Sequence, residues 1–293
     1  MTATDARTAA FEEHRPHLRA VAYRMLGSLA EADDAVQDAW LRYSRADTSD
    51  VDNLGGWLTT VVARVCLNLL RTRRTRREEP MPPRLPDPIV SAAGGPDPEQ
   101  EVLLADAVGL AMQVVVDTLP PAERVAFVLH DVFGMPFDEI APIVGRSPTA
   151  ARQLASRGRR RVQGSRAVSD GTLAEQRAVV DAFFAAARRG DLQALLAILD
   201  PDVVVRADFG PTSSAPRESH GADAVAQQAL SFRALAPYAR PALINGAPGF
   251  VVMRADAPFS VLAFAVRAGL IVELDVVADP DRVSRLDLSV LDD

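Results

Sequence analysis

Apolar residues recur at helical spacing along the first quarter of the chain. Between residues 11 and 26 they repeat every three or four positions, and Gly27 then interrupts the pattern. Residues 31–43 predict a second helix with an acidic face, and residues 57–74 predict a third helix that ends among arginines. We therefore expect a helical domain over residues 5–77.

A proline-rich segment follows. Residues 78–100 contain seven prolines in 23 positions, so this segment cannot be a helix and is expected to be an extended linker. Helical patterns resume at 101–118, 121–133 and 137–144, and one more helix ends near Val162. These elements predict a second helical domain over residues 101–164.

The pattern changes character after Gly164. Residues 173–189 and 192–199 have the periodicity of amphipathic helices. Short strands are then expected at 203–207, 243–244, 250–254, 259–266 and 270–277, with turns at 246–249, 256–258 and 268–269. Helices followed by an antiparallel meander predict an α+β domain over residues 173–293.

The end of the second helical domain has the pattern of a helix-turn-helix. Gly145 can end one helix with a positive φ, Ser147 can cap the next, and Pro148 suits its first turn. No acidic residue occurs between Gly145 and Ala167. Because early residues of such a helix reach base edges, we expect this segment to bind DNA. The expected contacts are Arg146, Ser147, Thr149, Arg152, Gln153, Ser156, Arg157, Arg159 and Arg160.

Composition narrows the remaining possibilities. The net charge is −7, all 32 basic residues other than histidine are arginine, and the apparent isoelectric point near 5.2 argues against a general nucleic-acid coat. Cys66 is the single cysteine, which excludes an internal disulfide and is expected to be a buried thiol. Without a long apolar run or a signal-peptide pattern, we expect a cytoplasmic protein that does not span a membrane. No phosphate-binding glycine loop or metal-ligand spacing occurs, so no cofactor is expected.

The two helical domains resemble an extracytoplasmic-function sigma factor of bacterial RNA polymerase. The matching segments are residues 26–42, 56–71 and 119–161, which resemble its polymerase-binding helix, promoter-melting helix and −35-binding domain. The resemblance implies core RNA polymerase, through its β′ clamp and β flap, and promoter DNA as partners. It implies polymerase contacts at Asp33, Asp34, Gln37, Asp38 and Trp40, and −10 contacts at Arg64, Asn68, Arg71, Arg73 and Arg74.

The last domain resembles the cone-shaped SnoaL-like α+β fold, on its final hairpin over residues 266–281. Asp279, Pro280, Asp281 and Arg282 are similar to an Asn-Pro-Asp-Lys motif of a sigma subgroup that has this extension. Residues 83–89 are similar to the subgroup's Trp-Leu-Pro-Glu-Pro linker motif, with arginine in place of tryptophan. The resemblance implies an intramolecular contact between the extension and the sigma core that modulates promoter-directed transcription.

Two other classes of protein are alternatives to this interpretation. SnoaL-like enzymes use an Asp or His inside the cone, but His220, Asp208 and Asp275 form no convincing acid and base pair in the sequence. We therefore expect no enzymatic activity. The alternative is a helix-turn-helix transcriptional regulator with a ligand-sensing domain, which would bind duplex DNA without polymerase.

Overall fold

The structure is a computed structural model that describes residues 3–49, 51–76, 85–93, 110–165, 169–211, 213, 218–255, 257–288 and 291. Its contacts divide the chain into two compact units. The first unit consists of Met1–Pro83 and Val115–Gly164, and the second consists of Arg84–Val114 and Ser165–Asp293. Each unit is described by itself.

The first unit begins with the three expected helices. These are α1 (Ala3–Leu26), α2 (Leu29–Arg45) and α3 (Leu54–Arg76), which pack against one another. Their apolar stripes meet in a core that includes Leu18, Met25, Leu58 and Leu67, all nearly inaccessible to solvent. Cys66 is buried in this core, and burial raises the pKa of its thiol to about 12.

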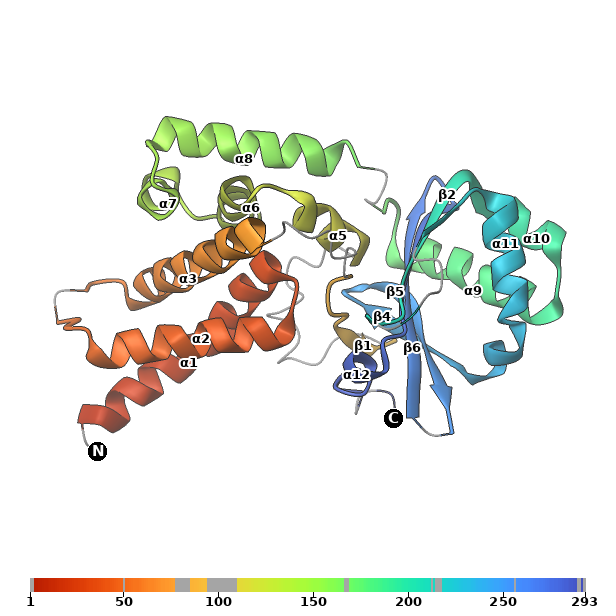
Figure 1. Cartoon of the computed structure of the whole chain (residues 1–293), viewed down its shortest axis with the longest axis horizontal. Coiled ribbons are helices and arrows are strands. Elements are labelled where there is room, and N and C mark those ends of the chain that lie inside the picture. The colour runs from red at the N-terminus through yellow and green to blue at the C-terminus, as the bar shows by residue number, and fades with distance from the viewer. Residues whose placement is uncertain are drawn as a thin grey trace. The chain divides into compact units, whose positions relative to one another are not determined.

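The second half of this unit contains the predicted helix-turn-helix. Its helices are α5 (Leu110–Thr118), α6 (Pro121–Phe127), the π-helical turn η1 (Val128–Val132), α7 (Phe137–Val144) and α8 (Pro148–Gln163). In Figure 1, α6 and α7 lie between α3 and α8. Gly158 allows α8 to approach α6 closely, because a Cβ at this position would lie 2.9 Å from Cβ of Phe127. The two helical regions therefore form one packed body.

A buried arginine ties the two helical regions together. Arg124 of α6 donates to the backbone oxygen of Met25 at 2.9 Å and to Asp117 Oδ1 at 2.7 Å. Burying a guanidinium requires such partners, because an unpaired charge in the interior is costly. The end of α1 and the end of α5 are thus held to α6 by one side chain.

The second unit is built on a mixed sheet with strand order β1-β4-β5-β6-β7-β2-β3. The strands are β1 (Val90–Ala92), β2 (Leu199–Asp208), β3 (Glu218–His220), β4 (Ala239–Ile244), β5 (Ala247–Arg254), β6 (Ala257–Arg267) and β7 (Leu270–Val277). The predicted antiparallel meander is confirmed for β4 to β7, whereas β2 runs parallel to β7. The expected α+β class is therefore confirmed.

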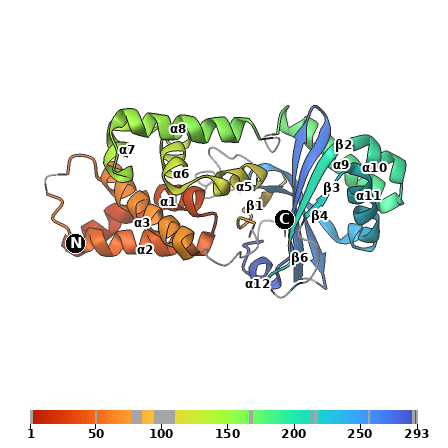
Figure 2. The ribbon, with the colours of Figure 1, turned by 45° about the horizontal axis from the view of Figure 1, so that its top comes forward.

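Helices cover one face of this sheet. They are α9 (Leu173–Arg189), α10 (Leu192–Ile198), α11 (Ala222–Ser231) and the 3₁₀ helix η2 (Arg233–Tyr238), seen beside the sheet in Figure 2. Leu85, Val90, Leu110 and the short helix α12 (Pro280–Val283) contribute to a second apolar cluster on the other face. The sequence pattern predicted α9 and α10 but missed α11, whose buried face consists of Val225 and Ala226.

Part of the proline-rich linker joins the sheet. Val90 of β1 pairs with Ile244 of β4, and the Ile89 amide donates to Asn245 Oδ1 at 3.0 Å. The expected extended conformation is confirmed for residues 85–92, but the segment is an edge strand of the second unit. Asn245 and Gly246 have φ values of 50° and 78°, so they alone form the turn. The turn predicted at residues 246–249 was therefore placed too late, because β5 already begins at Ala247.

Candidate functional site

Helix α8, the second helix of the predicted helix-turn-helix, begins as the sequence predicts. Gly145 has a φ of 68°, and Ser147 Oγ accepts a hydrogen bond from the Ala150 amide at 3.3 Å. On the surface of α8 a shallow hollow is lined by Arg152, Gln153, Ser156, Arg157 and Arg160. Donors of several kinds thus converge on one exposed strip, which suits contacts to base edges and phosphates.

Acidic residues from other elements hold some of these arginines. Arg157 donates to Glu123 at 2.7 Å, and Arg159 donates to Asp131 at 2.5 Å. Arg152 instead lies over the Phe137 ring, with its guanidinium carbon 5.2 Å from the ring centroid, and within the described residues Arg160 has no acidic partner. Sequence reasoning missed this division because Glu123 lies 34 positions before Arg157, and Asp131 lies 28 positions before Arg159.

On α3 the expected −10 contacts divide between two faces. Arg64, Asn68 and Arg71 are four and three positions apart and form one exposed stripe, and Arg74 is also exposed. Arg73 lies on the opposite side, where it donates to the Leu26 backbone oxygen at 3.2 Å and pairs with Glu31. Arg73 is therefore part of the packing of α3 on the end of α1.

The acidic face of α2 is also partly occupied. Asp34 and Gln37 are exposed, whereas Asp33 accepts from Arg19 at 2.6 Å. Asp38 accepts from Arg42 at 3.0 Å. Leu41 is 44% exposed on the same face, and this apolar side chain was not predicted as part of the surface.

Trp40 borders this face but packs inward. Its ring lies 5.1 Å from the Phe11 ring and 6.0 Å from the Tyr43 ring, measured between centroids. Such tilted aromatic contacts stabilise the packing of α1 on α2. The structure thus places Trp40 beside the acidic face as a half-buried packing residue.

The motif of residues 279–282 forms a buried clamp on the linker, which we call the Arg282 clamp. Arg282 donates to Asp208 Oδ2 at 2.5 Å, to the Leu85 backbone oxygen at 2.7 Å, and to Asp87 Oδ1 from Nε at 2.9 Å and Nη2 at 2.6 Å. Asp279 caps α12 by accepting from the Asp281 amide at 3.0 Å. Pro280 and Asp281 are exposed, so Arg282 is the member of the motif that holds the linker.

Further charges lie on the same sheet face. Arg206 of β2 pairs with Glu273 and with Asp275 of β7, the latter at 3.2 Å. Burial raises the pKa of Asp275 to about 6, against the opposing effect of Arg206. One arginine thus faces two buried carboxylates. Among the described residues, Glu273 Oε2 and Asp275 Oδ2 have no hydrogen-bond partner.

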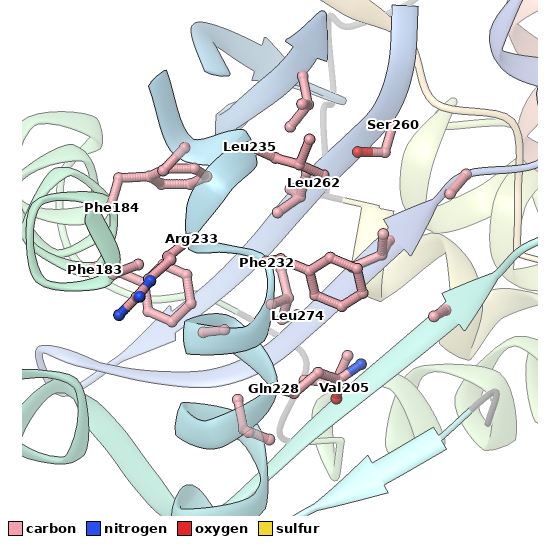
Figure 3. A pocket seen from close by; sticks show the side chains of 18 of the residues that line it. Phe183, Phe184, Val205, Gln228, Phe232, Arg233, Leu235, Ser260, Leu262 and Leu274 are labelled. Atoms are coloured by element: carbon pink, nitrogen blue, oxygen red, sulfur yellow. The ribbon is translucent and has the colours of Figure 1, made fainter. Parts of the chain in front are cut away.

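The opposite sheet face bounds an apolar cavity of about 130 Å³ (Figure 3). Its walls come from α9, α11, η2 and the strands, and its polar lining residues are Gln228, Arg233 and Ser260. No carboxylate or imidazole lines it within the described part of the chain, and His220 is exposed on β3. Asp208 and Asp275 lie on the other face. The cavity could therefore bind an apolar molecule, but its described lining has no acid and base pair for proton transfer.

Two features are absent from the residues that the structure describes. No helix among them is long and apolar enough to cross a membrane. No group of three potential metal-ligating side chains gathers among them.

Comparison with known proteins gives a consistent result along the chain. Residues 10–76 match the Sigma-70 region 2 family, and residues 110–162 match the Sigma-70, region 4 family. The chain is 36% identical to the probable ECF RNA polymerase sigma factor SigI of Mycobacterium tuberculosis, over 98% of both chains. It is 39% identical to SigJ of the same organism, over 93% of this chain and 91% of SigJ. The crystal structure of SigJ superposes with a TM-score of 0.77 at 35% identity, covering 96% of this chain and all of that one.

Proposed function

This chain belongs to the extracytoplasmic-function sigma factors of RNA polymerase, and from that premise we propose how its residues direct promoter-specific initiation. The capped helix α8 reads the −35 element in the major groove. Arg152 and Gln153 contact base edges, with Ser147, Thr149 and Ser156 beside them. Arg146, Arg157, Arg159 and Arg160 contact phosphates.

The observation that carries this proposal is the division of arginines on α8. Arg157 and Arg159 are held by acids of the scaffold, whereas Arg152 and Arg160, which line the exposed hollow together with Gln153 and Arg157, have no acidic partner among the described residues. Held side chains lose little conformational freedom on binding, so they suit fixed phosphate contacts. Each bidentate base contact contributes roughly 1–3 kcal/mol of discrimination.

For the first helical region we propose two surfaces. The stripe of Arg64, Asn68 and Arg71, with Arg74 nearby, binds the melted −10 strand. The face of Asp34, Gln37 and Leu41 docks on the β′ clamp of core polymerase, with the partly paired Asp33 and Asp38 at its border. The second helical region docks on the β flap.

The extension acts as a regulator in this proposal, through the Arg282 clamp. Elements named −35 and −10 are about 25 base pairs apart, which is roughly 85 Å of duplex. The 23-residue linker spans at most about 80 Å when fully extended, and the clamp fixes the direction of residues 85–92, which account for about 26 Å of that reach. Since α6 and α7 pack on α3, binding both elements requires these helices to separate. The clamp therefore limits how far they separate.

A regulator of this kind needs no chemistry of its own. Sigma factors are not enzymes, and the cavity lining lacks an acid and base pair within the described residues. We accordingly propose a non-enzymatic protein that works with polymerase in the cytoplasm.

The test is run-off transcription with bacterial core polymerase and the full chain on promoters selected from its own genome. Arg152→Ala is expected to relax base preference at one −35 position, and Arg160→Ala to weaken binding on all promoters and lower the salt slope by about one. Arg189→Ala on α9, outside the DNA surface, is the matched control. Duplex binding without polymerase, together with no initiation, would reject the proposal in favour of a helix-turn-helix regulator.

A further inference from the structure

We propose that the cavity of the second unit is an effector site for a small, neutral, mainly apolar molecule that carries one oxygen, of the size of a substituted benzene ring. We also infer that binding there is coupled to the Arg282 clamp. The site itself stands independently of the function proposed above. The coupling rests on that function, because it gives the clamp its regulatory meaning.

The size and lining of the cavity define the body of the ligand. Its volume of about 130 Å³ is close to that of an engineered apolar cavity of roughly 150 Å³ that stays dry and binds benzene. Phe183 and Phe184 of α9 contribute aromatic walls, and Leu262 and Leu274 line the sheet side. A flat apolar ring would gain contact with all of these side chains and displace no well-bonded water.

One side chain indicates the polar group of the ligand. Ser260 is only 5% exposed, and within the described residues its hydroxyl makes no hydrogen bond. Figure 3 shows this hydroxyl directed toward Leu235 and Leu262, inside the cavity. A hydroxyl on a cavity wall can pair with a polar group that enters the cavity, so an oxygen of the ligand would be its partner. Gln228 of α11, half-buried at the wall, offers a second polar contact through its side-chain amide.

The charge of the lining favours a neutral ligand. Arg233 is the one charged residue that lines the cavity in the described part of the chain, and it is exposed. A Cβ at Gly190 would lie 3.6 Å from Arg233 Nη1, so this guanidinium lies at the carbonyl end of α9. Helix C-termini stabilise cations, and Arg233 is thus already placed against negative partial charge. An anion inside the apolar cavity would lack a buried counter-ion.

The cavity and the clamp share the same two chain segments. Ala207 and Phe209 line the cavity, and the residue between them, Asp208, accepts from Arg282 on the other sheet face. Ala278 also lines the cavity, and its amide donates to the Asp208 backbone oxygen at 2.8 Å. A ligand that orders these segments makes the carboxylate of Asp208 a better fixed partner for Arg282. Binding and clamping should therefore strengthen each other.

The binding test uses the full chain and fluorine NMR with three probes of one ring size. We expect saturable binding of 4-fluorophenol, weaker binding of fluorobenzene and the weakest binding of 4-fluorobenzoate. Ser260→Ala should weaken the binding of 4-fluorophenol by about three- to tenfold and leave the affinity for fluorobenzene unchanged. Ser219→Ala, on β3 outside the cavity, is the control.

Two filling variants locate the site. Ala229→Phe on α11 and Val276→Phe on β7 each place a ring in the cavity and should abolish binding of all three probes. The second variant keeps the test valid if the first fails to fold. No saturable binding of any probe by the wild-type chain would overturn the site. Binding that survives both filling variants, or that is tightest for the carboxylate, would also overturn it.

The coupling is tested separately from the function. Asp87→Ala, which removes the linker carboxylate from the clamp outside the cavity and leaves Arg282 paired with Asp208, should weaken the binding of 4-fluorophenol by about fivefold. Unchanged affinity in this variant would overturn the coupling and leave the site standing. If Asp87→Ala weakens the binding of 4-fluorophenol but neither the probe nor the substitution changes transcription, the coupling stands and the proposed regulation is rejected.

Discussion

Replacing Asp87 by alanine should release the linker strand without unfolding the sheet. Asp87 accepts two hydrogen bonds from Arg282, at 2.6 and 2.9 Å, and its side chain is 16% exposed. Arg282 keeps Asp208 and the Leu85 oxygen as partners, so the substitution leaves no buried charge unpaired. Hydrogen bonds to charged groups contribute about 1.5–3 kcal/mol, and we expect a loss of about 2–3 kcal/mol from the local opening free energy.

Native-state hydrogen exchange measures this local opening directly. Since about 1.4 kcal/mol corresponds to a tenfold change, the Ile89 amide should exchange about 30 to 150 times faster. Peptides from β5 to β7 should keep their wild-type exchange rates, because β4 is the one strand of the described sheet that pairs with β1. Asp281→Ala changes an exposed carboxylate of the same motif and is the matched control.

Two results would refute this reasoning. If residues 85–93 exchange at the wild-type rate in Asp87→Ala, the clamp does not hold the linker strand. If every strand of the sheet exchanges faster to the same degree, Asp87 supports the whole unit and the opening is not local.

Three further outcomes follow from named contacts. Because burial raises the pKa of Asp275 to about 6, the folded state retains a proton that the unfolded chain releases, and the free energy of unfolding of the second unit should fall by about 3 kcal/mol as the pH rises from about 4 to 6. Asp275→Asn should remove this fall, measured by urea unfolding monitored through hydrogen exchange of β7, and an unchanged pH dependence in the variant would contradict the prediction. Arg71→Ala should slow promoter opening with little change in stability, whereas Arg73→Ala should lower the unfolding midpoint of the first unit; equal effects in both assays would argue against the two faces of α3. Gly158→Ala should destabilise the first unit by about 1–3 kcal/mol through overpacking against Phe127, and a wild-type melting curve would show that α8 shifts freely.

Local chemistry was sufficient to predict the bounds of α7, α8 and α9 to within one residue. Gly145, Ser147 and Pro148 each act on the backbone of their own neighbours, so α8 could be placed from the sequence. The bounds of α9 followed from its amphipathic periodicity, and the structure shows that Thr172 and Gly190 cap its two ends. The DNA-binding interpretation of α8 likewise depended on residues close together in the chain.

Contacts between distant residues required the tertiary structure. Arg282 and Asp87 are 195 positions apart, and no periodicity in either segment indicates that one buries the charge of the other. The strand at residues 90–92 exists only because β4 offers an edge for pairing. Composition therefore predicted an extended linker and could not predict where it lies.

The sequence by itself determined the order of the helical and α+β regions and the cationic surface of α8, because these depend on local spacing and residue type. The tertiary structure decided which arginines are held, since Arg73 and Arg157 find their acidic partners on other helices. It also decided that Asp208 and Asp275 lie opposite the cavity, because sheet register alone sets the face on which each side chain lies.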